Sequence, residues 1–334
     1  MRTIMDVVSG PPESSALIGE SAVFAVLRSR LPAVAKAQRT TLISGQTGTG
    51  KDVIARTLHQ QSERRGQPYV TVHCAALPEP LLESEMFGHA RGAFTGATQA
   101  RAGLIRTASE GTLFLDEIDS LPQSAQAKML RFLETGEYRP VGADRAERSG
   151  AWVIAATNQD LGERVREGTF RADLLFRLAV VRLDVPPLRA REDDVVRLAE
   201  HFLRAASGDA KRFDEEARRA LLSYDWPGNV RELKHRVESA ALFSEDPTIG
   251  AASLNLATPP STQAAAPPSW PVGHPLGSQL FSLMCDGGLT LSQAITMCER
   301  LIIEAALTAE NNNRTRAAGR LGIHVRTIFK KLAD

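Results

Sequence analysis

The sequence predicts an α/β fold with a parallel sheet around a phosphate-binding loop, followed by a helical lid and a small all-α domain. A glycine-rich loop ending in Lys51 lies between a β-rich run and a helical segment. Two more apolar runs end in polar side chains, at Asp116-Glu117 and at Asn158, as in parallel strands buried on both faces. Residues 192–243 show helical periodicity without strand runs.

Composition bounds the class of protein. The 334 residues allow two or three domains, and a net charge of +1 means that any nucleic-acid surface is local. Cys74, Cys285 and Cys298 form neither a disulfide framework nor a zinc pattern, which fits a reducing compartment. The N-terminus has no signal-peptide core, and no apolar run approaches the roughly 18 residues that span a bilayer. We expect a soluble cytoplasmic protein with no membrane partner.

Changes in composition divide the chain into segments. Gly10-Pro11-Pro12 breaks regular structure near the start, Pro186-Pro187 ends the α/β part, and a region rich in Pro, Ala, Ser and Thr precedes the last helices. We expect a flexible leader at 1–16, an α/β subdomain at 17–185, a helical lid at 186–246, a flexible linker at 247–276 and a helical domain at 277–334. Because the leader is short, we expect no N-terminal sensory domain. A first helix over 20–38 is expected to be interrupted near Pro32.

The glycine-rich loop follows a short strand at 40–44 and opens a helix. It consists of Gly45, Gln46, Thr47, Gly48, Thr49, Gly50 and Lys51. Backbone N–H groups of such a loop hold phosphates together with the helix N-terminus, and the lysine reaches the terminal phosphates. Asp52 stands where the general motif has a Ser or Thr that binds magnesium. A chance glycine-rich turn is the alternative, and the flanking elements argue against it.

Polar residues follow the other predicted strands. Residues 111–117 form an apolar strand that ends in Asp116, which can bind Mg²⁺, and Glu117, which can polarise an attacking water. A strand over 69–72 ends at His73, either a structural residue or part of the site. A strand over 152–158 places Asn158 at its carboxyl end, where ligands bind in open α/β sheets.

Three arginines are candidates for contact with phosphates. Arg171 and Arg177 are either surface salt-bridge partners or arginine fingers that stabilise charge on a transferring phosphoryl group. Arg231 falls in the first turn of a helix, where a cation opposes the helix dipole. It therefore needs an anionic partner, either a ligand or a glutamate.

A glycine-flanked hexapeptide lies between the phosphate-binding loop and the acidic strand. It consists of Gly92, Ala93, Phe94, Thr95, Gly96 and Ala97, after a helical approach over 77–91. Glycines free the backbone to turn, while Phe94 places a large ring at the centre. The segment is either a buried turn with Phe94 in the core or a loop that moves with the nucleotide.

The C-terminal segment has a helix-turn-helix pattern. An apolar-striped helix over 291–309 precedes two short helices at 314–321 and 325–333. No acid lies between residues 314 and 331, which suits phosphate contacts, although a solvated basic face is the alternative. The candidate DNA-binding residues are Arg314, Arg316, His324, Val325, Arg326, Thr327, Lys330 and Lys331, of which residues 324–327 would face base edges.

Together these motifs resemble the sigma-54-dependent transcriptional activators, which are AAA+ ATPases with a C-terminal Fis-type helix-turn-helix. The resemblance runs from about residue 17 to 333, and its most specific element is GAFTGA at 92–97 after Phe87-Gly88-His89. The other matches are Walker A (GQTGTGKD, in which an acidic last residue is usual), Walker B (GTLFLDEI), sensor I (AATN), the arginine-finger region (FRADLLFRL) and sensor II (WPGNVRELK).

The resemblance implies ATP and Mg²⁺ as cofactors and a role for each site residue. Lys51 would bind the phosphates and Asp116 the magnesium ion. Glu117 would activate the attacking water, and Asn158 would sense the γ-phosphate. Arg171 and Arg177 would reach the site of a neighbouring subunit, and Arg231 would contact the nucleotide of its own subunit. The hexapeptide, with Phe94 and Thr95 at its centre, would contact sigma-54.

The implied function is activation of transcription. A ring, usually a hexamer, of this chain alone or with a similar subunit would bind upstream double-stranded DNA. ATP hydrolysis would then remodel the closed complex of sigma-54 RNA polymerase holoenzyme, under control by abundance or by a protein in trans. One alternative is a DNA-binding regulator whose AAA+ module binds nucleotide and sets the oligomeric state without remodelling sigma-54. A general AAA+ remodeller is a third reading, which the helix-turn-helix and the intact hexapeptide disfavour.

Three positions depart from the family pattern. His73 stands where an asparagine usually holds the Walker B glutamate, and histidine can donate one hydrogen bond to Glu117. Arg106 replaces a usual glutamate, and Trp152 replaces a frequent arginine. These changes concern the coupling between nucleotide state and loop position, so we expect slower or partner-dependent hydrolysis.

Overall fold

The computed structural model describes residues 7–8, 17–76, 78–94, 97–191, 193–256, 282, 290–310 and 313–321. The chain divides into two compact units, residues 1–258 and 259–334. Among the described residues, no helix is long and apolar enough to cross a membrane.

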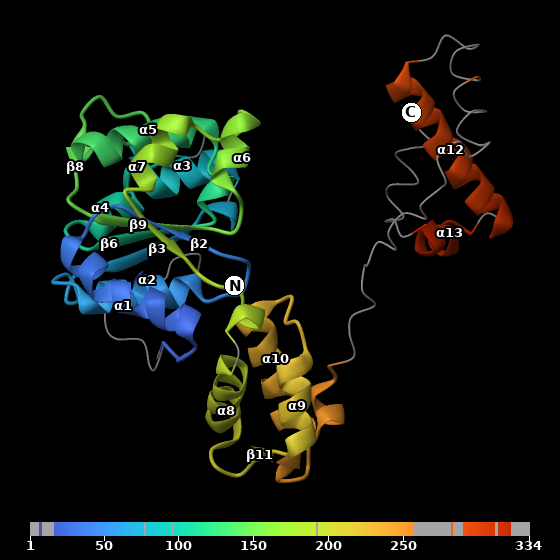
Figure 1. Ribbon diagram of the computed structural model, residues 1–334. Coiled ribbons are helices and arrows are strands. Elements are labelled where there is room, and N and C mark those ends of the chain that lie inside the picture. The colour runs from blue at the N-terminus through green and yellow to red at the C-terminus, as the bar shows by residue number, and fades with distance from the viewer. Residues whose placement is uncertain are drawn as a thin grey trace. The chain divides into compact units, whose positions relative to one another are not determined.

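A six-stranded sheet forms the centre of the first unit (Figure 1). In spatial order its strands are β1 (Val7–Val8), β3 (Tyr69–His73), β6 (Thr112–Asp116), β9 (Trp152–Thr157), β2 (Thr41–Ser44) and β10 (Val181–Asp184). All neighbouring strands are parallel except β1, which pairs antiparallel with β3 at the edge. The predicted parallel α/β fold is confirmed, and the carboxyl ends of β3, β6 and β9 lie side by side.

The edge strand β1 differs from the expected flexible leader. Val7 and Val8 are β-branched residues, which favour strands, and they pair with Val70 and Tyr69. The rest of 1–16 lies outside the described residues.

Helices cover both faces of the sheet (Figure 1). The helices α1 (Ala22–Ala37) and α2 (Lys51–Gln61) pack on one face. The other face is covered by α3 (Glu79–Phe87), α4 (Leu104–Ala108), α5 (Gln123–Thr135), α6 (Leu161–Arg166) and α7 (Ala172–Leu178). Successive residues of β6 alternate between the faces: Leu113 and Leu115 join one cluster and Phe114 the other.

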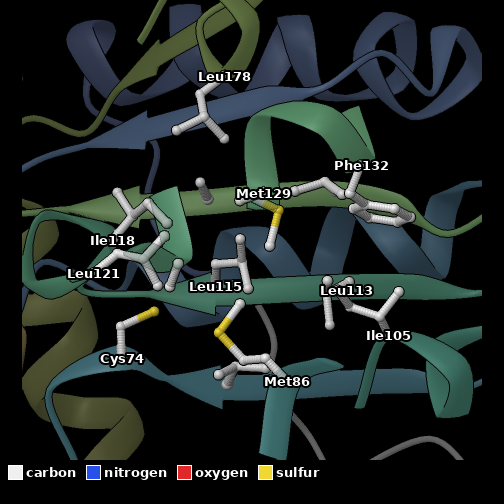
Figure 2. Close-up of a cluster of buried hydrophobic side chains, with 14 of the residues drawn as sticks. Cys74, Met86, Ile105, Leu113, Leu115, Ile118, Leu121, Met129, Phe132 and Leu178 are labelled. Carbon is white, nitrogen blue, oxygen red and sulfur yellow. The ribbon is translucent and has the colours of Figure 1, made fainter. Parts of the chain in front are cut away.

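The cluster under α3–α7 is the larger of the two cores. Figure 2 shows Leu113 and Leu115 of β6 in it with Met86, Met129 and Phe132. Burying each such side chain contributes about 1.5–3 kcal/mol. The core therefore fixes the positions of the strands whose carboxyl ends carry the candidate site residues.

Two helices differ from their predicted course. The helix α1 continues through Pro32, and the buried residues Leu27, Leu31 and Val34 on both sides of the proline hold it against the sheet. The helix α3 ends at Phe87 rather than continuing to 91, because Gly88 has a φ of 80°. Residues after it form β4 (Gly88–His89), which pairs antiparallel with β5 (Arg101–Ala102).

A second hairpin lies beside the first. It consists of β7 (Glu137–Tyr138) and β8 (Glu147–Arg148), which pair antiparallel. Short 3₁₀ helices η1 (Cys74–Ala76) and η2 (Ile118–Ser120) follow β3 and β6.

The lid is helical as predicted, but it extends beyond residue 246. It contains η3 (Leu188–Ala190), α8 (Asp194–Ser207), α9 (Glu215–Ser223), α10 (Asn229–Phe243) and η4 (Ala251–Leu254). After α10 the chain forms β12 (Thr248–Ile249), which pairs parallel with β11 (Arg212–Phe213). Ile249 and Leu254 are buried in the lid core, so residues 247–256 belong to the lid and not to the predicted linker. Residues 257–276 lie outside the described residues.

The second unit contains α12 (Leu291–Ala309) and α13 (Arg314–Leu321), both with the predicted bounds. Thr290 and Gln293 form a capping box at the start of α12. Ile303, Leu307 and Ala318 form a small core between the two helices. The predicted helix over 325–333 lies outside the described residues.

Candidate functional site

A cavity of about 600 Å³ lies between the α/β subdomain and the lid. This volume is within the range of about 300–1,000 Å³ that is usual for small-ligand sites. The phosphate-binding loop, the ends of β3, β6 and β9, and the helices α8 and α10 all contribute to its walls.

The phosphate-binding loop has the backbone that anion binding needs. Gly48 and Gly50 have φ angles of 79° and 91°, and α2 begins at Lys51. The N–H groups of Gly48 and Gly50 have no acceptor among the described residues, so they are available to phosphate oxygens. The loop therefore has the backbone geometry that phosphate binding requires, and phosphate binding by these residues stays a prediction.

The Lys51 ammonium lies within this loop. It donates to the carbonyl oxygens of Gly45 (2.8 Å) and Gln46 (3.2 Å). Burial lowers its pKa, while the carboxylates of Asp116, Asp119, Asp52 and Glu117 act in the opposite direction. A phosphate group entering the cavity would add further negative charge beside this cation.

The two acids at the end of β6 have different backbones. Asp116 ends the strand, whereas Glu117 has φ 54° and ψ 49°, the left-handed region that is uncommon for a residue with a side chain. Its N–H donates to Asp116 Oδ1 (3.1 Å). Glu117 therefore leaves the strand direction at a strained turn, a feature that clusters at functional sites.

His73 contacts a different acid from the one expected. Its Nδ1 lies 3.3 Å from Asp116 Oδ2, and no hydrogen bond from His73 to Glu117 is present among the described residues. The parallel register explains the pairing, because His73 lies directly opposite Asp116 on adjacent strands.

The end of β9 is connected to both neighbouring elements. Asn158 Nδ2 donates to Thr47 Oγ1 (2.9 Å), which places this amide against the phosphate-binding loop. Thr157 Oγ1 donates to Asp119 Oδ1 (2.6 Å) in η2. Sequence reasoning missed Asp119, and its position two residues after Glu117 was the only local signal.

The lid supplies several residues to the cavity. Arg231 lines the cavity, and its guanidinium forms no ion pair among the described residues. The glutamate that the sequence allowed as its anionic partner is therefore not found there. Sequence reasoning also missed Arg191 and Asn229, which are buried and hydrogen-bond to the phosphate-binding loop. The lid end of the cavity is apolar, because four side chains of its wall belong to the lid core or pack against it, namely Ile18, Leu198, Phe202 and Val230.

The hexapeptide loop joins β4 to β5. Phe94 is 43% exposed, so its ring is not part of the core, and it packs edge-on against the His89 ring with 5.1 Å between centroids. The Gly92 N–H donates to the Ala97 carbonyl (2.8 Å), which closes the loop, while Ala97 itself is buried. Thr95 and Gly96 lie outside the described residues.

The second hairpin supports the base of this loop. The Val141 N–H donates to the Gly88 carbonyl (2.8 Å), and the Ala90 N–H donates to the Val141 carbonyl (2.9 Å). Gly142 packs directly against Ala93.

Comparison with known proteins identifies the family. Residues 17–184 match the sigma-54 interaction domain, residues 189–269 match the AAA+ ATPase lid domain, and residues 294–334 match the bacterial regulatory protein, Fis family. The chain is 39% identical over 337 residues to the DNA-binding transcriptional regulator NtrC of Azospirillum brasilense, with 96% of this chain and 70% of that protein covered. The chain belongs to the sigma-54-dependent transcriptional activators.

Other relatives support the same family assignment. The chain is 44% identical over 321 residues to nitric oxide reductase transcription regulator NorR2 of Cupriavidus necator, with 94% of this chain and 62% of the relative covered. The chain thus spans about three fifths of that relative's length. The crystal structure of NtrX from Brucella abortus in complex with ATP matches 96% of this chain and 69% of its own, with a TM-score of 0.66 and 28% identity.

The two candidate arginine fingers do not line the cavity of their own chain. Arg171 precedes α7 and forms a double hydrogen bond with Asp173, at 3.0 Å and 2.7 Å. This pairing raises the pKa of Arg171 and lowers the pKa of Asp173. Arg177 is exposed near the end of α7.

The C-terminal unit carries the first of the predicted DNA-binding residues. Arg314 begins α13, and Arg316 is exposed on it, with its N–H bonded to Asn313 Oδ1 (3.2 Å). The remaining candidates lie outside the described residues, namely His324, Val325, Arg326, Thr327, Lys330 and Lys331.

The two other departures from the family pattern have structural partners. Arg106 pairs with Glu147 (3.4 Å), which also accepts a hydrogen bond from the Tyr138 hydroxyl (2.7 Å). Trp152 is buried, and its Nε1 donates to the Arg39 carbonyl (2.8 Å). Both residues therefore support the fold at positions away from the cavity walls.

Proposed function

We propose that this protein activates transcription from sigma-54 promoters by hydrolysing ATP in a ring and remodelling the closed polymerase complex through its GAFTGA loop. The family membership supports a sigma-54-dependent regulator with an AAA+ ATPase domain and a DNA-binding helix-turn-helix. The remodelling mechanism rests on one observation above all. Phe94 is exposed at the tip of a hairpin on the same subdomain that carries the phosphate-binding loop.

The cavity suits ATP. Its apolar lid end can hold a base, and the loop amides with Lys51 can hold the phosphates. Glu117 is the candidate base. A water oxygen would attack the γ-phosphorus and pass a proton to the Glu117 carboxylate, and the bond to the β–γ bridging oxygen would break to give ADP and phosphate. Arg231, whose guanidinium forms no ion pair among the described residues, would contact the nucleotide.

The residues fit magnesium as an ion shared with the nucleotide. Among the described residues, no group of three or more His, Cys, Asp or Glu side chains could hold a metal alone. Mg²⁺ at phosphate sites is usually held by one or two carboxylates together with phosphate oxygens, and Asp116 supplies such a carboxylate at the cavity wall. When bound, the ion would neutralise charge on the phosphates.

A complete site would need a second subunit. Arg171 and Arg177 lie off the cavity of their own chain, whereas hydrolysis of ATP benefits from a cation at the transferring phosphoryl group. A neighbouring chain in a ring would supply it, which supports a hexamer or a mixed ring with a similar subunit. Double-stranded DNA bound by the C-terminal unit would place this ring near the promoter.

The test is the ATPase rate as a function of protein concentration, with and without sigma-54 RNA polymerase holoenzyme. We expect specific activity to rise steeply with concentration and open complexes to form only with hydrolysable ATP. A rate that is absent or independent of concentration, with nucleotide-dependent assembly intact, would favour the alternative regulator that only binds nucleotide.

A further inference from the structure

Residues of the lid, at the start of α10 and just after η3, hold the carbonyl groups of the phosphate-binding loop. Asn229 Nδ2 donates to the Thr47 carbonyl (3.0 Å), and the Arg231 backbone N–H donates to the Gly48 carbonyl (3.2 Å). Arg191 Nη2 donates to the Thr49 carbonyl (3.1 Å). Three donors from the lid thus bind three consecutive carbonyl groups of the loop.

The peptide units of the loop connect these contacts to the phosphate site. The Thr47 carbonyl shares its peptide unit with the Gly48 N–H, and the Thr49 carbonyl shares its unit with the Gly50 N–H. Those two N–H groups have no acceptor among the described residues. A donor on the carbonyl side polarises a peptide unit and strengthens its N–H as a donor on the other side. The lid contacts therefore both orient and strengthen these two N–H groups, which belong to glycines that line the cavity.

The side-chain amide of Asn229 is held in one orientation. It is fully buried, and its backbone has a φ of 53°, a conformation that asparagine tolerates better than most residues. Its Oδ1 accepts from the Leu188 N–H (2.8 Å). Because that N–H can only donate, the amide oxygen must face Leu188, and the amide nitrogen must face the loop.

Arg191 and Gly48 also hold the lid against the phosphate-binding loop. Arg191 is buried, its Nε donates to the Pro186 carbonyl (3.1 Å), and its guanidinium lies 4.2 Å from the centre of the Phe24 ring. Burial lowers its pKa to about 10, which still leaves it charged at neutral pH. Gly48 has no Cβ, and a Cβ there would collide with the Gly228 carbonyl. The loop and the lid therefore pack backbone against backbone at this point.

We propose that Asn229 is a positioning residue of the phosphate site, assisted by Arg191. Asn229 does not line the cavity, yet it holds the peptide units whose N–H groups would bind phosphate. The proposal rests on the proposed nucleotide function of this cavity. Its specific consequence is that loss of Asn229 weakens the binding of phosphates and not the binding of the base.

The decisive variant is Asn229→Asp. The carboxylate can still accept from Leu188 but cannot donate to Thr47, and it places two acceptors face to face. Asn255→Asp is the matched control, because Asn255 is also a lid asparagine with a left-handed backbone (φ 46°) and it has no contact with the loop among the described residues. Thermal unfolding of both variants shows whether each is folded.

Two measurements on the full chain separate the possibilities. Calorimetric titration with ADP and with adenosine compares a ligand with phosphates and one without. Hydrogen exchange of the nucleotide-free protein reports the order of the loop amides. We expect Asn229→Asp to raise the Kd for ADP by roughly tenfold, leave the Kd for adenosine within about twofold, and speed exchange in residues 46–50. Asn255→Asp should match the wild type in all three.

Other outcomes overturn the proposal. An equal loss of affinity for ADP and adenosine means general damage to the lid, because lid side chains also line the apolar end of the cavity. Unchanged ADP affinity with unchanged loop exchange means that Asn229 positions nothing. If Asn229→Asp does not fold, Arg191→Lys is the second variant, since lysine keeps the charge but cannot reach both the Pro186 and Thr49 carbonyls. It should show the same selective loss of ADP affinity.

Failure of the proposed function gives a different pattern. If the wild type binds no ADP, or if Lys51→Ala binds ADP as well as the wild type does, the cavity is not the nucleotide site. The loop exchange of the nucleotide-free variants then decides alone: faster exchange in Asn229→Asp sustains the positioning role, and unchanged exchange removes it.

Discussion

Thr157 donates its hydroxyl to the Asp119 carboxylate at 2.6 Å, beyond the point where β6 and β9 stop pairing. The last paired residues are Leu115 and Ala155, so this side-chain bond continues the contact between the two strands. Glu117 lies two residues before Asp119, and Asn158 directly follows Thr157. The bond therefore links the candidate catalytic acid to the candidate sensor of the γ-phosphate.

Loss of the bond between Thr157 and Asp119 should slow ATP hydrolysis more than it weakens ATP binding. We expect Asp119→Ala to lower kcat about tenfold, because the left-handed turn at Glu117 loses its tether to β9 and a charge-assisted hydrogen bond contributes about 1.5–3 kcal/mol. The Kd for ATP should change less than threefold. Thr157→Ser is the control, since it keeps the hydroxyl and should retain most activity. A loss confined to ATP affinity would contradict the positioning role.

Replacing the candidate base should separate binding from chemistry. We expect Glu117→Gln to bind ATP like the wild type and to lower kcat by about 10²–10⁴, the usual contribution of general base catalysis. Rapid-quench measurement of phosphate release gives kcat, and a filter-binding assay gives the ATP affinity. Substantial residual turnover would assign water activation to another residue.

Mixing two inactive variants tests whether arginines act between subunits. Arg171→Ala and Glu117→Gln should each be nearly inactive alone. In a mixed ring, a chain with intact Glu117 can receive Arg171 from a Glu117→Gln neighbour, so ATPase activity should recover to a measurable fraction of wild type. Recovery should be absent when Lys51→Ala replaces Arg171→Ala, because that chain binds no nucleotide. If Arg171→Ala alone is fully active, Arg177 becomes the candidate finger.

The hexapeptide should be needed for activation and not for hydrolysis. We expect Thr95→Ala to keep at least half of the wild-type ATPase rate and to abolish open-complex formation on a sigma-54 promoter. Ala143→Ser, in the supporting hairpin, is the control substitution and should leave both rates near wild type. Loss of both activities in Thr95→Ala would mean that the loop is structural.

The core should be sensitive to loss of volume under α3–α7. We expect Leu113→Ala to lower the free energy of unfolding by about 2–5 kcal/mol, the usual range for a fully buried leucine. Urea denaturation followed by circular dichroism measures this change. Leu242→Ala, at a side chain that is 76% exposed on α10, should change stability by less than about 0.5 kcal/mol.

The sequence predicted the elements whose signals are local. The strands β2, β3, β6 and β9 lie within a residue or two of their expected bounds, because each is rich in apolar and β-branched residues and ends next to polar ones. The helices α12 and α13 matched as well. The family motifs also placed Lys51, Asp116, Glu117 and Asn158 around one cavity.

The missed features depend on contacts between distant residues. Asn229 and Thr47 are 182 positions apart, and Arg191 and Thr49 are 142 apart, so no local pattern records their hydrogen bonds. His73 was expected to contact Glu117, but the strand register sets it opposite Asp116. Strands of two residues, such as β4 and β12, are too short to show a period of two in the sequence.

The extension of the lid to residue 256 determines where the chain can be cut. An expression fragment ending at 246 would lose β12 and the buried side chains of Ile249 and Leu254, each of which contributes about 1.5–3 kcal/mol by burial. It would also leave β11 without its partner and open an apolar hollow on the lid. A truncation site after residue 256 keeps all the described residues of the lid, and activity lost in a fragment ending at 246 would reflect damaged packing and not the absence of the C-terminal unit.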